Sequence, residues 1–508
     1  MARRSFEAPE ADGTGTAGVA GTRARGLRGA FTSGPVLLAA FAFAIMGDPV
    51  SSVAYAMEAG LRSLGGRLTL LVPTMIVVLG IIVLVAVNYH HLYARFPEGG
   101  GDAAASASAF SEGLAFLPLA ALIVDYALTI AISVAAGASA IIAYLPGLAP
   151  TRTGLAVVLL VAVAGLTLLG HGGRAVFAVM TISFALVGSV VIILGTRAAP
   201  VHDVAASAAP AAGHSALLGV LVAFPVGMAL ATGVEAPSSA IAQLGQLDNA
   251  GRLRFGRTTL WLMVGIVIWL TLGIAALGVH LHVGLPPRNS TWIAQVAQAA
   301  AGRGVLFAAF QVSSAVLLLA AASSSFQAGP GLLKALARGG GGVGILPAFL
   351  SQSNRHHTPY WGVAVFLAAS AVLVAATGGQ EQRLVLFYAV AVFIAFWCGL
   401  AAMTRFFRRD KRPWLAGVSV CGVLAVGLTL GTDLARGYPI VSLIAACAIA
   451  ALLYWMWVRA GRPCGVAQAE QIAEAGLAAS TALREEEPAA AIDDAERPGF
   501  PPKGANLP

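Results

Sequence analysis

Charged residues are scarce in this chain: Asp, Glu, Lys and Arg make up only 11% of its 508 residues, whereas hydrophobic residues make up 58%. The mean hydropathy is +0.82. A soluble protein of this length needs a much more polar surface, so the composition excludes a soluble globular protein. It predicts a polytopic membrane protein whose apolar helices face lipid.

Cysteine is also rare, with four residues in the whole chain. None stands at the spacing of a metal-ligating pair, and the first three lie in apolar runs. A disulfide framework and a zinc site are therefore not expected. We interpret the four as small packing residues, namely Cys398, Cys421, Cys447 and Cys464.

Apolar runs long enough to cross a bilayer as a helix, about 20 residues each, recur along the chain. Twelve can be counted, so the predicted fold class is an all-α polytopic membrane protein with about twelve transmembrane helices. They lie near residues 34–58, 67–92, 114–145, 153–171, 174–196, 214–243, 257–282, 304–335, 359–377, 382–405, 414–432 and 438–458.

The net charge of +8 comes from Lys and Arg residues that flank the apolar runs one loop at a time. They form no continuous basic patch, so a nucleic-acid partner is not expected. Basic residues concentrate in the loops that share a side with both termini, most densely in 405-RFFRRDKRP-413. By the positive-inside rule that side is cytoplasmic, so we expect a multi-pass protein of the plasma membrane with both termini in the cytoplasm.

The chain is predicted to have four parts. We expect a disordered cytoplasmic N-tail over 1–33, a core of ten helices over 34–410, two further helices over 411–459 and a cytoplasmic C-tail over 460–508. The C-tail is rich in Ala, Glu and Pro, which predicts a mobile segment. One short helix is expected in it, around 468-QAEQIAEAGLAAS-480.

Three carboxylates lie well inside apolar runs, namely Asp48, Asp125 and Glu235, and Glu58 lies at a helix end. A carboxylate near the bilayer centre costs at least about 2.5 kcal/mol and usually faces a cavity or a partner. One such acid could simply cap a broken helix. Three together indicate a functional site within the membrane.

The first and sixth spans carry the same kind of interruption. An acid, a proline and a serine pair occur in 47-GDPVSS-52 and again in 233-GVEAPSS-239. Gly and Pro can interrupt the helical hydrogen-bond ladder and free backbone carbonyls and amides. Paired interruptions five helices apart indicate an inverted-repeat transporter with its site at the membrane midplane, although two coincidental proline kinks would share the pattern.

The third span presents a polar stripe within 124-VDYALTIAISVAAG-137. At about 100° per residue, its polar side chains fall within one sector of the helix. Thr and Ser alone often bond back to their own backbone, but next to two further polar groups they indicate a site lining. The stripe consists of Asp125, Tyr126, Thr129 and Ser133.

The residue types in these spans indicate which ligand they would bind. Carboxylates, hydroxyls and freed carbonyls are hard oxygen donors that favour a cation. An amino acid substrate would place its own carboxylate near the first break, where Asp48 would repel it. A buried Glu235 could couple transport to protons, because its protonation can change with its surroundings. Ser323 to Gln327 are polar enough to line the inner vestibule, with helix packing as an equal alternative.

These motifs resemble those of the amino acid, polyamine and organocation transporter superfamily, and within it the KUP-type potassium uptake transporters of the KimA-like branch. The FPEGGG loop is shared across the superfamily, whereas GDPVSS is more specific. The resemblance covers about residues 34–410 and rests on 47-GDPVSSVAY-55, 96-FPEGGGDAAASASAF-110, 124-VDYALTIAISVAAG-137, 230-LATGVEAPSSAI-241 and 388-YAVAVFIAF-396.

The resemblance implies a LeuT-like 5+5 inverted repeat with broken helices 1 and 6. Ion-binding or pocket roles fall by resemblance on Asp48, Tyr55, Asp125, Tyr126, Thr129, Ser133 and Thr232. Potassium itself is expected at Asp48, Tyr55, Thr129 and Thr232. Glu235 is the expected proton-coupling carboxylate, and a looser alignment places Tyr388 beside the pocket.

The implied function is import of potassium by alternating access with proton symport. No cofactor is expected apart from the transported K⁺ and H⁺, no catalytic residue is assigned, and the expected partners are a small cation and the lipid bilayer. The KimA-like branch carries a larger C-terminal domain that helps to hold a dimer. This chain has only about 50 residues after its last span, so a homodimer stays an open alternative.

Three other functions compete with potassium import. A proton-coupled amino acid or amine permease would use the same fold, and a cationic amine is harder to exclude than an amino acid. An intramembrane aspartyl protease would need two facing aspartates and usually a GxGD motif, which this sequence does not contain. A sensor that binds without transporting remains a further alternative.

Overall fold

The computed structural model describes residues 34–170, 174–200, 215–339, 341–437 and 439–481. The N-tail predicted over 1–33 lies outside these ranges. So do residues 482–508, the end of the predicted C-tail.

Twelve helical segments in the described ranges are long and apolar enough to cross a membrane, as the sequence predicts. Among the described residues, the one isolated β-bridge joins Ala337 and Leu346, so the all-α prediction is confirmed. The spanning helices are α2 (Gly34–Ile45) with α3 (Gly47–Ser63), α4 (Leu71–Arg95), α6 (Phe116–Tyr144), α7 (Arg152–Leu168), α8 (Arg174–Gly195), α9 (Ala216–Gly227) with α10 (Ala236–Ala240), α11 (Asn249–His280), α13 (Val305–Leu336), α14 (Tyr360–Thr377), α15 (Glu381–Arg409), α16 (Pro413–Leu434) and α17 (Ile440–Arg459).

Short elements connect the spans. Two of them are helices that do not span, α5 (Gly101–Ala109) and α12 (Trp292–Ala301). The single turns of 3₁₀ helix are η1 (Leu68–Leu70), η2 (Glu112–Ala115), η3 (Pro146–Thr151), η4 (Met228–Ala231), η5 (Ile241–Gln243), η6 (Ala348–Ser351) and η7 (Val466–Gln468).

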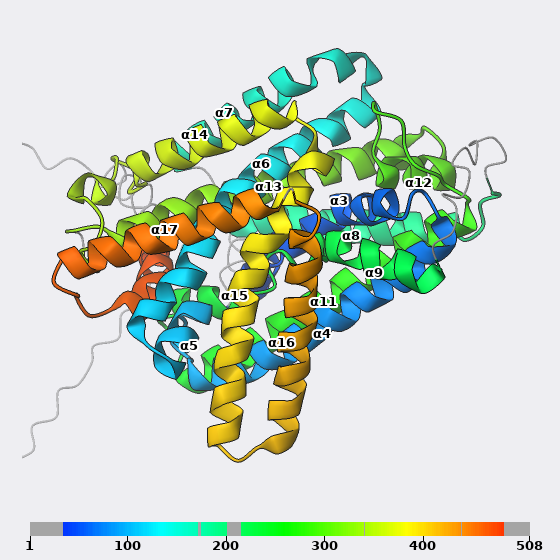
Figure 1. Ribbon diagram of the computed structural model, residues 1–508. Helices are drawn as coiled ribbons and strands as arrows, with labels where there is room; N and C mark the ends of the chain where they lie inside the picture. The colour runs from blue at the N-terminus through cyan, green and yellow to red at the C-terminus, as the bar shows by residue number, and fades with distance from the viewer. Residues whose placement is uncertain (1–33, 171–173, 201–214, 340, 438, 482–508) are drawn as a thin grey trace, which may run out of the picture.

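The spans differ in how much of their surface the protein covers. In the third span 83% of the apolar window is buried, and in the sixth and tenth 72% and 71%, against 22% in the last span. Figure 1 shows α6, α13 and α15 in the middle of the molecule, with α7 and α14 side by side at one edge. The polar residues of the third and sixth spans are therefore enclosed by protein, because lipid chains cannot form hydrogen bonds with polar groups.

The break in the first span is small. α2 ends at Ile45 and α3 begins at Gly47, yet the ladder nearly continues, since Met46 N donates to the Ala42 carbonyl at 3.1 Å and Val50 N to the Met46 carbonyl at 3.0 Å. The predicted interruption lies where expected, but it bends the helix at one residue and unwinds no full turn.

The break in the sixth span is larger. α9 passes through η4, and the chain is then extended at Thr232 (φ −50°, ψ 133°) and left-handed at Gly233 (φ +73°) before α10 begins. A Cβ atom on Gly233 would lie 2.7 Å from the Pro49 Cδ atom and 3.1 Å from the Asp48 Oδ2 atom. Glycine is needed here for both its backbone angle and its size. The two breaks therefore pack closely against each other, and Ser52 Oγ of the first donates to the Leu230 carbonyl of the sixth span at 3.2 Å.

The described part of the C-tail is folded against the core. The predicted short helix is present over residues 469–481, directly after η7, and we call it the C-terminal helix. Its packing differs from the mobile segment that composition predicts, because Ala469 is fully buried and Glu470 and Glu474 are buried as well.

Candidate functional site

A cavity of about 140 Å³ lies beside the two broken spans. It is lined by four of the predicted site residues, Asp48, Asp125, Tyr126 and Glu235. The carboxylates of Asp48, Asp125 and Glu235 are close enough to influence one another electrostatically. The structure thus brings together the three acids that the sequence singles out from three different spans.

Carboxylate oxygens in the cavity lining are buried without a hydrogen-bond partner among the described residues. A buried polar atom that lacks a partner costs about 1–3 kcal/mol, and several in one place indicate a ligand or water site. They come from the first, third and sixth spans and are Asp48 Oδ1, Asp125 Oδ1 and Glu235 Oε2. Thr129 Oγ1 and Ser133 Oγ of the third span are also buried without a partner, but these residues do not line the cavity.

The serine pairs of the two motifs bond partly within their own helices and partly across the protein, since Ser52 Oγ also donates to the Leu230 carbonyl of the sixth span at 3.2 Å and the Ser239 hydroxyl donates to Glu470. Ser51 Oγ donates to the Asp48 carbonyl at 2.7 Å, and Ser238 Oγ donates to the Glu235 carbonyl at the same distance. Ser52 Oγ donates to the Pro49 carbonyl at 2.6 Å. The carbonyls that the breaks were expected to free are thus already satisfied at these positions, and the carboxylate side chains are the free acceptors.

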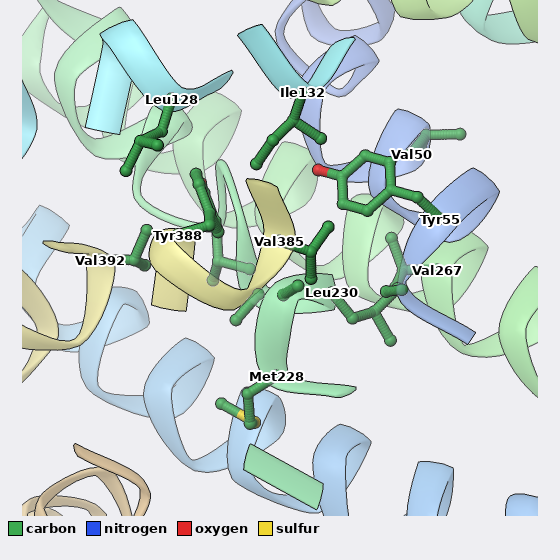
Figure 2. Close-up of a cluster of buried hydrophobic side chains, with 14 of the residues drawn as sticks. Val50, Tyr55, Leu128, Ile132, Met228, Leu230, Val267, Val385, Tyr388 and Val392 are labelled. Atoms are coloured by element: carbon green, nitrogen blue, oxygen red, sulfur yellow. The ribbon is translucent and has the colours of Figure 1, made fainter. Parts of the chain in front are cut away.

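Three predicted site residues are buried but do not belong to the cavity lining. Tyr55, Thr129 and Thr232 are almost fully buried and do not line the cavity wall. Figure 2 shows the Tyr55 hydroxyl pointing toward Ile132 of α6, with Tyr388 among the same apolar side chains. Thr232 Oγ1 donates its proton to the Ala229 carbonyl at 2.7 Å. The lone pairs of this hydroxyl oxygen can therefore still coordinate a cation.

Ser133 is likewise buried on α6, in line with Asp125 and Thr129. Its Oγ atom is one of the unpartnered oxygens. The side chains of the predicted polar stripe therefore pack inside the protein, and the end of the stripe that carries Asp125 lines the cavity.

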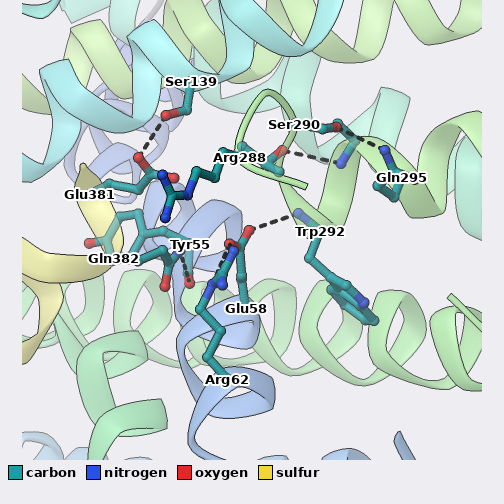
Figure 3. A network of polar contacts seen from close by, with 12 residues as sticks. Tyr55, Glu58, Arg62, Ser139, Arg288, Ser290, Trp292, Gln295, Glu381 and Gln382 are labelled. Atoms are coloured by element: carbon teal, nitrogen blue, oxygen red, sulfur yellow. Dashed lines mark hydrogen bonds and ion pairs between the residues drawn. The ribbon is translucent and has the colours of Figure 1, made fainter. Parts of the chain in front are cut away.

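Near the C-terminal ends of α3 and α6, a polar network closes the protein (Figure 3). Glu58 accepts from Arg62 Nε at 2.9 Å and from the backbone nitrogen of Trp292 at 2.8 Å. Glu381 accepts from Ser139 Oγ at 2.6 Å and pairs with Arg152 at 3.4 Å. This network ties α3, α6, α7, α12 and α15 together on the side away from the C-terminal helix.

Several cavity residues were not assigned to the site from sequence. Ser239, Gln243 and Glu474 line it, and the last of these comes from the C-terminal helix. Ser239 stands in the second serine pair, which was a usable signal, whereas no local pattern connects Gln243 with Glu474. Ser324, Ser325 and Gln327 of α13 also line the cavity, in the run for which a vestibule role was weighed against packing.

Asp102, in the first turn of α5 directly after the FPEGGG loop, is a further buried acid outside the spans. It is only 6% exposed and accepts from the Tyr89 hydroxyl at 2.7 Å. Burial raises the pKa of Asp102 to about 8, partly offset by the hydrogen bond from Tyr89. Its position supports α5 against α4 and does not line the cavity.

The family model described as amino acid permease matches residues 37–468, which is most of the chain. The chain belongs to the amino acid permease family. Together with its twelve candidate spans, this makes it a multi-pass membrane protein whose family role is transport.

One curated relative is the potassium transporter KimA of Bacillus subtilis (strain 168), 28% identical over 392 residues. The match covers 74% of this chain and 63% of that relative, so the chain spans less than two thirds of the relative's length. The resemblance inferred from the motifs is thereby confirmed.

Solved structures of a manganese transporter from Eremococcus coleocola are also similar. A variant of it shares 17% identity, with 84% of this chain and 94% of that chain covered and a TM-score of 0.45. The same transporter in complex with an aromatic bis-isothiourea substituted compound shares 18%, with 83% and 95% covered and a TM-score of 0.46.

Proposed function

We propose that this permease family member is a secondary active transporter that imports potassium by alternating access, with protons as the coupling ion. The observation that carries the proposal is the group of buried, unpartnered carboxylate oxygens of Asp48, Asp125 and Glu235, which meet from three spans at one cavity. A cation would satisfy them, whereas an anionic ligand would meet three carboxylates.

Potassium suits this donor set better than zinc or copper. The cavity lining contains neither His nor Cys among the described residues, and its donors are carboxylate, amide and hydroxyl groups. Hard oxygen donors suit ions such as potassium, magnesium, calcium and manganese, whereas imidazole and thiolate favour zinc or copper. The curated relative named for potassium transport supports the same ion.

Proton coupling would fall to Glu235. It stands at the start of α10, lines the cavity and has one oxygen without a hydrogen-bond partner. A proton on Glu235 would reduce the repulsion among the three acids, so that the proton and the cation could be carried together. In this proposal the protein lies in the plasma membrane with both termini in the cytoplasm, and the cavity lies on the side of the C-terminal helix.

The deciding experiment measures potassium uptake by the purified protein in liposomes that have an inward proton gradient. We expect uptake above that of empty liposomes, together with growth at limiting potassium when the chain is expressed in cells that lack potassium uptake. No uptake by a correctly inserted protein would overturn the potassium assignment.

An amino acid or amine permease is the second candidate, because the matching family model is described by amino acid transport. Labelled amino acids and a cationic amine are therefore measured in the same liposomes. Uptake of an amine without potassium would support this candidate. Asp48 and its neighbouring acids suit an ammonium group better than a carboxylate.

A further inference from the structure

The C-terminal helix is held in the core by its two buried glutamates. Glu470 and Glu474 keep only 6% and 8% of their surface exposed. Buried carboxyl groups need hydrogen-bond partners, and both have one. The Ser239 hydroxyl donates to Glu470, and Gln243 Nε2 donates to Glu474 Oε2 at 2.5 Å.

Glycines on two other elements allow the helix to approach closely. A Cβ atom on Gly101, at the start of α5, would lie 2.6 Å from the Glu470 Oε1 atom. A Cβ atom on Gly331, in α13, would lie 3.8 Å from the Ala473 carbonyl and 4.0 Å from the Ala473 Cβ atom. Figure 1 shows this red segment beside α5. The helix therefore joins α5, α13 and the segment from α10 to η5.

The same helix forms one wall of the candidate site. Glu474, Leu477 and Thr481 line the cavity that also contains the three acids of the broken spans. Ser239 and Gln243 belong to the segment that directly follows Glu235. Opening the cavity on this side, or moving α10 relative to α13, requires these contacts to break.

We propose that the C-terminal helix is an autoinhibitory plug. While it is docked, it closes the cavity on its side of the membrane, and a transport cycle requires it to leave. This inference rests on the proposed function, because it requires that the protein transports a substrate. It does not depend on which ion is transported.

A disulfide can hold the plug in place. In the full chain with its four native cysteines replaced, we introduce Gly331→Cys and Ala473→Cys, whose 4.0 Å Cβ separation lies in the range of about 3.5–4.5 Å that disulfides need. In liposomes, oxidation should reduce potassium uptake to that of empty liposomes, and a reductant should restore it. The Gly331→Cys single variant, treated in the same way, should be unaffected.

A second measurement reports undocking without any transport. Ala473→Cys lies on the buried face of the helix, and Ala475→Cys lies on its exposed face as a matched control. A maleimide should label position 473 slowly in the otherwise unchanged protein. The pair Glu470→Ala and Glu474→Ala should accelerate this labelling severalfold and leave labelling at position 475 unchanged.

The two measurements separate the two proposals. Full uptake by the oxidised variant, with the disulfide verified by mass spectrometry, would overturn the plug. Labelling at position 473 that stays negligible even when both glutamates are removed would overturn it as well. No potassium uptake by the unmodified protein, with normal undocking in the labelling measurement, would count against the proposed ion and leave the plug supported.

Discussion

Asp48 is the residue on which the candidate site depends most directly. It lines the cavity, has a buried unpartnered oxygen, and its Oδ2 atom would lie 3.1 Å from a Cβ atom on Gly233 of the other broken span. Its own carbonyl is satisfied by Ser51, so the carboxylate is the group left for a ligand.

We expect Asp48→Asn to abolish uptake at limiting potassium without preventing membrane insertion. A hydrogen bond or contact to a charged group contributes about 1.5–3 kcal/mol, so the affinity should fall roughly 10- to 100-fold. Uptake measured over a range of potassium concentrations tests this. Asp410→Asn, which removes an exposed ion pair with Arg95, is the control and should transport normally. Unchanged uptake by Asp48→Asn would mean that the site is misplaced.

Gly233→Ala should destabilise the protein and lower uptake. An L-residue in the left-handed region costs roughly 1–2 kcal/mol, and the new methyl group would press against Pro49. The melting temperature in detergent measures the loss. Gly80→Ala, on α4 where a Cβ atom meets nothing within 4 Å, is the matched control. Equal melting temperatures for the two variants would contradict the direct contact between the breaks.

Asp102 should make stability depend on pH. Because its pKa is raised from 3.8 to about 8 by burial, the folded protein keeps a proton that the unfolded chain releases. Its contribution is full below about pH 4 and is lost as the pH rises through about 8, so the free energy of unfolding falls over that range.

Asp102→Asn should reduce this loss, since Asn can still accept from the Tyr89 hydroxyl. Melting temperatures below and above about pH 8 test the expectation. Glu98→Gln, an exposed change in the preceding FPEGGG loop, serves as control. A pH profile of Asp102→Asn that matched the unmodified protein would exclude Asp102 as the titrating group.

Among the elements, the C-terminal helix should respond to pH through Glu470. Burial raises the pKa of Glu470 from 4.5 to about 7 in the docked helix, the hydrogen bond from Ser239 lowers it in part, and Glu474 raises it. Asp102 of α5 and Tyr126 of α6 are the other titratable groups within electrostatic reach. Docking is thus fully favoured below about pH 4.5 and weakens as the pH rises through about 7.

Labelling at Ala473→Cys relative to Ala475→Cys should therefore increase with pH. The ratio corrects for the pH dependence of the thiols themselves. Glu470→Gln, which is neutral at every pH, should flatten the ratio. A ratio that rises equally in Glu470→Gln would assign the pH response to another group.

The two broken spans show how far an element can be predicted from its own residues. Gly, Pro and Ser locate both breaks correctly, because each residue type acts locally on the helical ladder. Their extent differs, however, from one residue at Met46 to a left-handed turn at Gly233. The contact with Pro49 requires the larger break, and that contact is not visible in either motif alone.

For the molecule as a whole, the two sides of the membrane differ. One side is closed by the network of Glu58, Arg62, Arg152 and Glu381, and on the other the cavity is bounded by the C-terminal helix. A transporter that alternates must break the first group of contacts in one half of its cycle. The proposed proton coupling links that change to Glu235.

Glu235→Gln should remove the dependence of potassium uptake on the proton gradient. A permanently neutral side chain imitates the protonated state and cannot release a proton. Uptake in liposomes with and without an inward proton gradient measures the change, with Glu98→Gln as an exposed control. A gradient that still accelerates the Glu235→Gln variant would exclude Glu235 as the coupling group.

The sequence by itself determined the twelve spans, the positions of both breaks and the three acids within the spans, because hydrophobic length and intramembrane charge are properties of single segments. Only the tertiary structure decided which oxygens meet at one cavity, that Tyr55 and Thr232 do not line it, and that Arg152 pairs with Glu381. It also placed the C-terminal helix against Ser239 and Gln243, more than 200 residues away in the chain. Such contacts depend on how distant segments pack, and no local pattern of residues encodes that packing.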